Sequence, residues 1–147
     1  MANILIVDDS AIQRGRMREA LRTQGHDVRE AGDGREALTV LEGFAPECIL
    51  LDLMMPEMGG LEFLRGQAER GRRTPTVVLH TDFPESTQEA CRLEGAIDFL
   101  LKPIDEKELQ SVVREALAAH AARTGGNDSG RTASAPISVP ETGSIEP

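Results

Sequence analysis

The stretch CILLDLMMPEMGG, residues 48–60, decides the fold of this chain. Its first four residues are apolar, too short a run for a helix and typical of a strand buried on both faces, as in parallel sheets. Asp52 ends this strand, and Pro56 with the Gly59-Gly60 pair then turns the chain away from the sheet, since these residues fix φ or permit a positive φ. Open α/β sheets place their chemistry at the carboxyl ends of their strands, so Asp52 is the first candidate for a functional residue.

Apolar strand patterns alternate with helical patterns along most of the chain. The predicted strands cover residues 2–7, 27–31, 48–52, 76–81 and 97–101; the predicted helices cover 10–24, 60–70 and 86–94, with two more beginning at Asp33 and Asp105. Such alternation predicts an α/β fold, a doubly wound five-stranded parallel sheet with helices on both faces. Two strand orders are common for such sheets, and we expect the 2-1-3-4-5 order of the flavodoxin-like three-layer sandwich, which places the first and third strands side by side.

Composition excludes several classes of function. The chain has 147 residues and a formal net charge of -9, from 25 acidic and 16 basic residues, which argues against non-specific binding to nucleic acid or to an anionic membrane. No apolar run approaches the length of a membrane span, and no signal segment opens the chain, so a cytoplasmic location is expected. Cys48 and Cys91 have neither metal-ligand spacing nor a disulfide framework, and we expect both to be reduced core residues.

The last part of the chain differs in composition from the rest. From residue 123 onward Gly, Ser, Thr, Pro and Ala dominate, and little apolar surface is left to bury. We therefore predict a folded domain over residues 1–122 and a disordered tail over residues 123–147.

Polar side chains stand at the carboxyl ends of four predicted strands, and these are Asp8 and Asp9, Asp52, Thr81 and Lys102. Three carboxylates at one sheet edge repel one another unless a cation is shared or one of them is protonated. Hard oxygen ligands favour Mg²⁺, which commonly binds one or two carboxylates together with a phosphate oxygen. A lysine and a hydroxyl opposite the metal suit a phosphoryl group, whose transition state spreads charge over three oxygens. With an aspartate as nucleophile, the product would be an acyl phosphate on the protein.

These motifs together resemble the receiver domain of two-component response regulators, and more narrowly the single-domain chemotaxis-type regulators. The resemblance covers roughly residues 2–121 and depends on four motifs: a strand ending in Asp8-Asp9, the LLDLMMPEMG run, a strand ending in Thr81, and GAIDFLLKP at residues 95–103. It implies a phosphorylation-activated switch that is not an enzyme beyond catalysing its own phosphorylation and dephosphorylation.

The resemblance also implies a role for each matching position. Asp52 would accept a phosphoryl group from a sensor histidine kinase or a histidine phosphotransfer protein. Mg²⁺ would be held by Asp52, directly by Asp9, largely through water by Asp8, and by the backbone carbonyl of Met54. Thr81 would hydrogen-bond the phosphoryl group, and Lys102 would pair with another of its oxygens.

The expected output surface lies on one side of this site. Phe99 matches the aromatic switch residue, and the surface made by residues 86–94, 97–101 and the last helix would change and control a downstream partner or a separate output domain. The same surface allows a homodimer. No direct contact with nucleic acid and no membrane insertion are implied.

Two neighbours of Thr81 depart from the family pattern. Asp82 stands where a small residue is usual and puts the phosphorylation rate and the choice of partner in doubt. Phe83 stands at a position that affects dephosphorylation, and its bulk suggests the hypothesis of a long-lived phosphorylated state. The competing interpretation is that both side chains point outward from a loop and have no effect on phosphorylation.

Three other functions remain as alternatives. A phosphorylation-independent, receiver-like scaffold would be favoured by Asp82 but not by the intact acidic set. An aspartate-based phosphohydrolase would need its two aspartates two positions apart on the first strand, whereas Asp8 and Asp9 are adjacent. A nucleotide or flavin module would need a glycine-rich loop where Asp8-Asp9-Ser10 stands.

Overall fold

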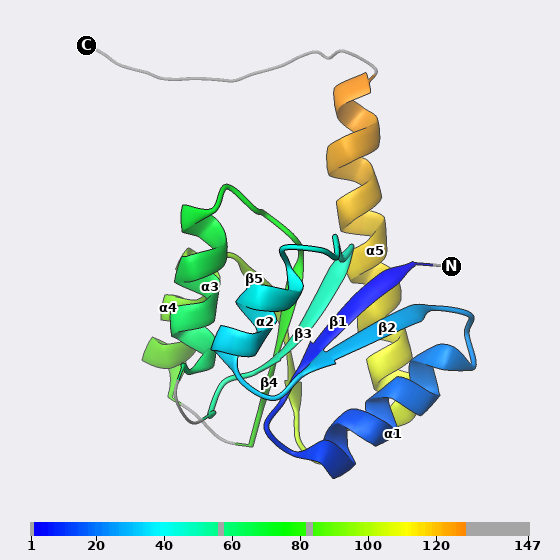
Figure 1. The fold of residues 1–147 in the computed structure, drawn as a ribbon, viewed down its shortest axis with the longest axis vertical. Coiled ribbons are helices and arrows are strands. Elements are labelled where there is room, and N and C mark those ends of the chain that lie inside the picture. The colour runs from blue at the N-terminus through cyan, green and yellow to red at the C-terminus, as the bar shows by residue number, and fades with distance from the viewer. Residues whose placement is uncertain (1, 56–57, 82–83, 129–147) are drawn as a thin grey trace.

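The computed structural model of the protein describes residues 2–55, 58–81 and 84–128. Strands and helices alternate along the chain (Figure 1), in the order β1 (Asn3–Val7), α1 (Ala11–Arg22), β2 (Asp27–Ala31), α2 (Gly34–Val40), β3 (Cys48–Asp52), α3 (Gly60–Glu69), β4 (Thr76–His80), α4 (Glu85–Leu93), β5 (Ala96–Leu101) and α5 (Glu106–Asp128). The predicted alternation is confirmed.

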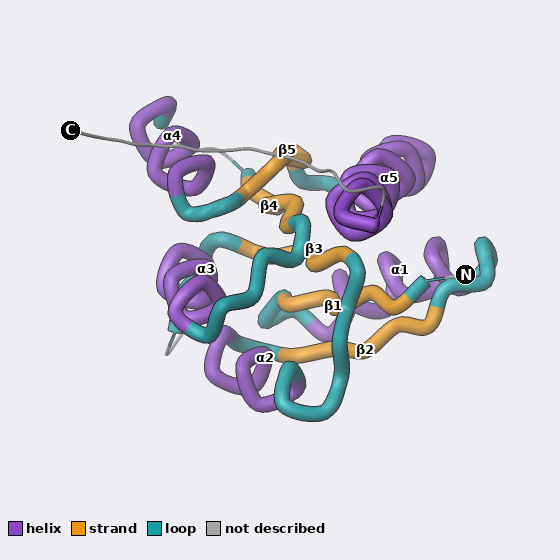
Figure 2. The backbone as a smooth tube through the Cα atoms, turned by 90° about the horizontal axis from the view of Figure 1, so that it is seen from above, coloured by secondary structure: helices purple, strands orange, loops and turns teal. Residues whose placement is uncertain are grey.

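The strands form one parallel sheet in the order β2-β1-β3-β4-β5, as predicted. Residue Val7 of β1 lies opposite Leu51 of β3, so the carboxyl ends of these two strands meet at the same edge. Figure 2 shows α1 and α5 on one face of the sheet and α2, α3 and α4 on the other. The result is the three-layer sandwich with its switch point between β1 and the neighbouring β3.

Each face of the sheet has its own hydrophobic core. Alternate residues of a strand point to opposite faces, so Ile4 and Ile6 of β1 pack with Met17 and Leu109 in one core. The intervening strand residues pack in the second core, together with Phe63 of α3. All five residues of β3 are buried, which is why its sequence is continuously apolar up to Asp52.

Short polar side chains begin the helices as the sequence indicates. The Ser10 hydroxyl accepts a hydrogen bond from the backbone N–H of Gln13, and the Asp33 carboxylate accepts one from that of Glu36. The carboxylate of Asp105 likewise accepts a hydrogen bond from the N–H of Glu108. These bonds satisfy backbone donors that have no partner within the helix.

Three details differ from the sequence-based expectations. β4 ends at His80, so Thr81 lies one residue beyond the strand. The Gly59-Gly60 pair does not adopt positive φ; a positive φ occurs instead at Gly25, Gly71 and Gly95 among the described glycines. Helix α5 extends to Asp128, past the predicted start of the tail at residue 123. Residues 129–147 lie outside the described part of the chain.

Two further predictions concern burial and membranes. Both cysteines are free and buried, as expected. Among the described residues, every helix is too short or too polar to cross a lipid bilayer.

Candidate functional site

The three predicted carboxylates converge at the carboxyl edge of the sheet. Asp8 follows β1 and Asp52 ends the adjacent β3, while Asp9 stands beside Asp8 at the start of the loop. One ligand oxygen from each of the three lies within 4.8 Å of the others. Asp8 and Asp52 are buried, with exposed fractions of 0% and 5%, whereas Asp9 faces solvent. The site therefore has a buried floor and one accessible carboxylate.

Lys102, which follows β5, reaches across to both buried carboxylates. Its Nζ lies 3.0 Å from Oδ2 of Asp8 and 3.4 Å from Oδ1 of Asp52. The other oxygen of Asp8 accepts a hydrogen bond from the backbone N–H of Ser10 at 2.9 Å. Both oxygens of Asp8 are thus engaged by the protein, while a single ammonium pairs with two buried carboxylates.

Burial and like charge perturb the titration of Asp52. Burial, followed by the neighbouring charge of Asp8, raises the pKa of Asp52 to about 6, although Lys102 and the N–H of Met54 act in the opposite direction. Burial alone would lower the pKa of Lys102, but its hydrogen bond to Asp8 and the charges of both aspartates outweigh this and raise it. The lysine stays charged, and the excess of negative charge remains on the carboxylates.

A divalent cation fits this donor set. Three carboxylate oxygens gather without any histidine or cysteine ligand in the described cluster. Hard oxygen donors suit Mg²⁺, and the exposed Asp9 leaves one side open to water and to further ligands. The arrangement can therefore hold a metal beside the buried carboxylate of Asp52.

Of the remaining predicted site residues, Thr81 and Met54 follow strand ends at the same edge and are exposed, whereas Phe99 lies within β5 opposite Val78. Thr81 is exposed directly after β4. Met54 is 77% exposed, and its N–H donates to Oδ1 of Asp52 at 3.4 Å. Phe99 on β5 is partly buried, and the ring of His80 meets it edge-to-face at 6.2 Å. The Asp82-Phe83 pair, which departs from the family pattern, lies outside the described residues.

Two residues that sequence reasoning did not assign also shape the site. A Cβ atom on Gly60 would lie 2.8 Å from the backbone oxygen of Asp52, so only glycine lets α3 begin this close to the end of β3. The sequence indicates a turn at the Gly59-Gly60 pair, but the structure requires glycine at position 60 for close approach. Arg14 of α1 donates from Nη1 to the backbone oxygen of Asp8 at 2.6 Å and is itself paired with Glu30, which no local motif indicates.

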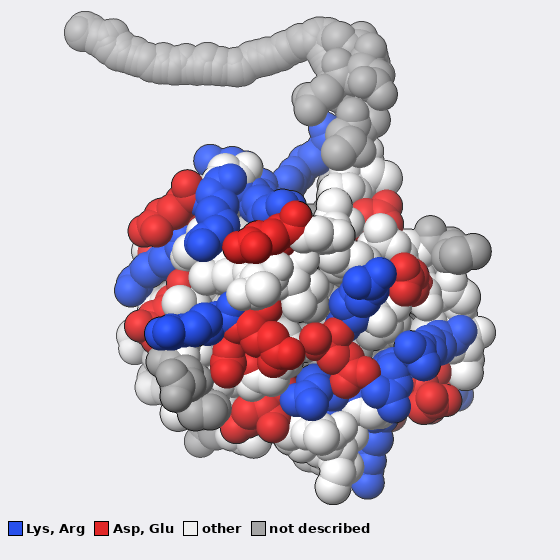
Figure 3. Space-filling model, viewed as in Figure 1, with Lys and Arg blue, Asp and Glu red and all other residues white. Residues whose placement is uncertain are grey.

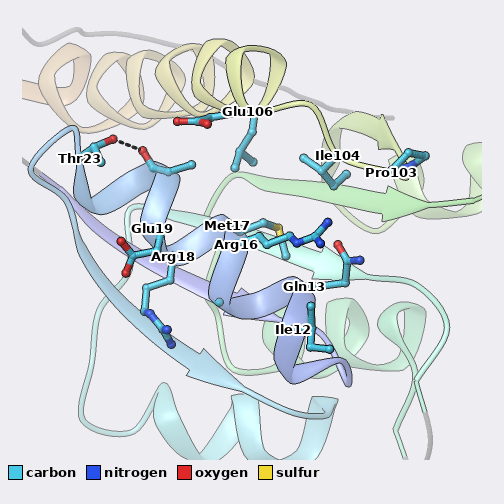
Figure 4. A pocket seen from close by; sticks show the side chains of 13 residues that line it. Ile12, Gln13, Arg16, Met17, Arg18, Glu19, Thr23, Pro103, Ile104 and Glu106 are labelled. Atoms are coloured by element: carbon cyan, nitrogen blue, oxygen red, sulfur yellow. Dashed lines mark hydrogen bonds between the residues drawn. The ribbon is translucent and has the colours of Figure 1, made fainter.

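A groove adjoins the site between α1 and the start of α5 (Figure 4). Its volume is about 650 Å³, and its lining includes Ile12, Met17, Pro103 and Ile104. Ile12 is 70% exposed, unusual for a large apolar side chain. Two of its lining residues lie close in the chain to the acidic cluster and its lysine: Ile12 is three residues after Asp9, and Pro103 directly follows Lys102.

Comparisons with known proteins agree on one family. Residues 4–114 match the response regulator receiver domain. The chain is 30% identical to protein PilH of Pseudomonas aeruginosa, over 80% of this chain and 99% of PilH. It is 39% identical to the regulatory protein AtoC of Escherichia coli, over 78% of this chain but only 25% of AtoC.

The fold agrees with this sequence match. The chemotaxis response regulator CheY4 of Vibrio cholerae superposes with a TM-score of 0.75 at 31% identity, over 80% of this chain and 99% of CheY4. The chain spans a quarter of AtoC and about half of the response regulator MprA of Mycolicibacterium vanbaalenii.

Proposed function

This chain belongs to the response regulator receiver domain family, and we propose that it is switched by transfer of a phosphoryl group to Asp52. A sensor histidine kinase or a histidine phosphotransfer protein would be the donor. A carboxylate oxygen of Asp52 attacks phosphorus, the phosphorus–nitrogen bond of the donor phosphohistidine breaks, and the imidazole leaves with its electron pair. The product is an acyl phosphate on Asp52.

The neighbouring residues support this step electrostatically. Mg²⁺ would be held by Asp9 and Asp52, by Asp8 through water and by the Met54 carbonyl, and it would neutralise charge on the phosphoryl oxygens. The occupied oxygens of Asp8 agree with a contact through water. Lys102, already 3.4 Å from Asp52, would pair with another phosphoryl oxygen.

The observation that carries the proposal is the arrangement of charged side chains around Asp52. A buried aspartate lies at a strand end within 4.8 Å of two further carboxylates and beside a lysine. Incubation with Mg²⁺ and radiolabelled acetyl phosphate should label the wild type, whereas Asp52→Asn should remain unlabelled. Asp27→Asn, at an exposed position at the start of β2 and so at the opposite edge of the sheet, is the matched control and should label normally. Full labelling of Asp52→Asn would place the nucleophile elsewhere.

Phosphorylation of Asp52 would change the conformation of residues on β4 and β5. Thr81 would move toward the phosphoryl group, and Phe99 would change its position in consequence. The surface of α4, β5 and α5 would then bind a downstream partner, or a second copy of the chain. Sedimentation of the protein with and without acetyl phosphate distinguishes a dimer from binding of a separate partner, since the sedimentation coefficient of a dimerising protein rises with its concentration.

The groove beside the site supports a docking place for the phosphodonor. A donor histidine must approach Asp52 from solvent, and the exposed Ile12 offers an apolar contact next to that approach. Ile12→Glu should slow phosphotransfer from the donor protein while labelling by acetyl phosphate stays unchanged. Equal slowing of both reactions would mean that the substitution disturbs the site itself.

A slow return to the unphosphorylated state is the remaining part of the proposal. The sequence supports it, since the family resemblance gives the position of Phe83 an effect on dephosphorylation, and a bulky residue there would hinder the attacking water. The phosphorylated protein should lose label slowly in Mg²⁺, and Phe83→Ala should accelerate the loss. A wild-type half-life of only seconds would contradict this part alone.

A further inference from the structure

A second cavity lies at the opposite end of the sheet from Asp52. It has a volume of about 590 Å³ and is lined by the ends of α3 and α4, by residues 72–74 before β4 and by Arg123 of α5. This volume is within the range of roughly 300–1,000 Å³ that is common for small-molecule sites. The receiver chemistry proposed above makes no use of it.

Four arginines line this cavity, and these are Arg72, Arg73, Arg92 and Arg123. Within the described part of the chain, none of the four forms an ion pair with a carboxylate. The lining contains one carboxylate, that of Glu94, which pairs outward with Arg65 at 3.1 Å. Figure 3 shows Lys and Arg side chains gathered at this end of the molecule. In a chain of net charge -9, such an uncompensated group attracts an anion.

Two of the four guanidinium groups are already held in place. Arg72 donates from Nη2 to the backbone oxygen of Leu41 at 2.7 Å. Arg92 lies over the ring of Phe99, 4.9 Å from its centroid. Fixed guanidinium groups lose less side-chain entropy when they bind a ligand, which favours phosphate recognition at this place.

A buried amide supplies the second observation. Gln67 of α3 lines the cavity with only 4% of its surface exposed, and its Oε1 accepts no hydrogen bond from the described residues. An unsatisfied buried acceptor is costly, and nearly all such groups in folded proteins have a partner. An ionised phosphate oxygen cannot satisfy it, because this acceptor needs a hydrogen carried on oxygen or nitrogen. The ligand must therefore combine negative charge with a hydrogen-bond donor.

The cavity also offers apolar surface. Leu93 of α4 lines it with 78% of its side chain exposed, next to the hydroxyl-bearing Thr74. We propose that this cavity binds an organic phosphate of nucleotide size, with its phosphates on the arginines and, once the buried amide turns toward the cavity, a hydroxyl or amino group donating to Gln67. The inference does not depend on phosphorylation of Asp52.

Isothermal titration of the full chain tests the site, with ADP, ribose 5-phosphate and inorganic phosphate as probes. We expect an organic phosphate to bind more tightly than inorganic phosphate. Arg73→Ala combined with Arg123→Ala should weaken this binding by about tenfold or more, since two charge-assisted contacts are lost. Arg22→Ala combined with Arg35→Ala removes the same charge from exposed helix positions elsewhere and should leave binding unchanged.

Replacing the Gln67 amide tests the site in a way that is independent of general charge attraction. Gln67→Leu keeps all four arginines and should reduce the preference for the organic probes over inorganic phosphate, while thermal unfolding verifies that the variant is folded. Any of three results would overturn the proposal: no binding of the organic probes at millimolar concentration, equal losses in the two double variants, or an unchanged preference in folded Gln67→Leu.

Discussion

Replacing Gly60 with alanine should damage the protein and its phosphorylation together. The added Cβ would lie 2.8 Å from the backbone oxygen of Asp52 and 2.9 Å from Cα of Leu53. Both neighbours are backbone atoms at the end of a fully buried strand, so they cannot rotate away as a side chain would. The oxygen and the new Cβ must move apart by more than half an ångström to reach ordinary contact.

The expected cost follows from overpacking at a rigid place. Substitutions that force backbone shifts in a packed interior destabilise proteins by about 1–3 kcal/mol, which for a domain of this size lowers the melting temperature by several degrees. The chain should still fold, because typical domains have roughly 5–15 kcal/mol of stability. The shifted backbone carries Asp52, so labelling by acetyl phosphate in Mg²⁺ should slow as well.

Gly15→Ala is the matched control, because it adds the same methyl group to another helical glycine. The nearest atom to its Cβ would be the flexible Nη2 of Arg18 at 3.6 Å, so there is room. Alanine in a helix interior is favoured over glycine by about 0.5–1 kcal/mol, and the control should melt slightly higher. Thermal unfolding and labelling rates of both variants decide the matter. If Gly60→Ala melts and reacts like the wild type, the close approach of α3 to β3 does not restrict this position.

Three further predictions concern other parts of the fold. Burial would raise the pKa of Glu30, but the hydrogen bonds and charges of Arg18 and Arg14 outweigh burial and lower this pKa in the folded protein. The ionised Glu30 therefore contributes its full stabilisation above the ordinary pKa of 4.5, and this stabilisation is lost as the pH falls through the lower folded-state pKa. Glu30→Gln should therefore cost about 1 kcal/mol at neutral pH and flatten the acid side of the stability curve measured by urea unfolding, and an unchanged acid slope would contradict this. Phe63→Ala, at a fully buried ring, should cost about 3–5 kcal/mol in the same assay, and a loss below about 1 kcal/mol would mean that the core refills. Burial raises the pKa of Cys48 to about 12, so neither buried thiol should react with a thiol reagent at pH 8 before urea unfolds the protein, and rapid labelling of the native chain would show that the core opens.

Local chemistry made much of the fold predictable. Ser10, Asp33 and Asp105 begin helices because a short polar side chain satisfies a nearby backbone N–H, an interaction that spans only three residues. Strand β3 could be recognised because burial on both faces demands an unbroken apolar run. The parallel order then followed from the alternation of strands and helices, with few alternatives left by the rules of crossover connections.

Electrostatic contacts between segments distant in the chain were harder to predict from the sequence. The sequence placed Asp8, Asp52 and Lys102 at one edge, but only the packed sheet decided that the ammonium lies 3.0 Å from Asp8 and 3.4 Å from Asp52. The pKa of Asp52 depends on burial and on these separations, and neither has a local signal. The bond from Arg14 to the backbone of Asp8 likewise depends on how α1 packs beside β2.

The sequence by itself determined the family, the sheet order and the edge at which the three carboxylates gather, because periodicity, caps and strand-end residues are local and repeat at known spacing. Only the tertiary structure decided why Gly60 must be glycine, which carboxylates are buried, and that four arginines and Gln67 share one cavity. Those properties are distances between segments far apart in the chain, and such distances exist only after both cores have packed.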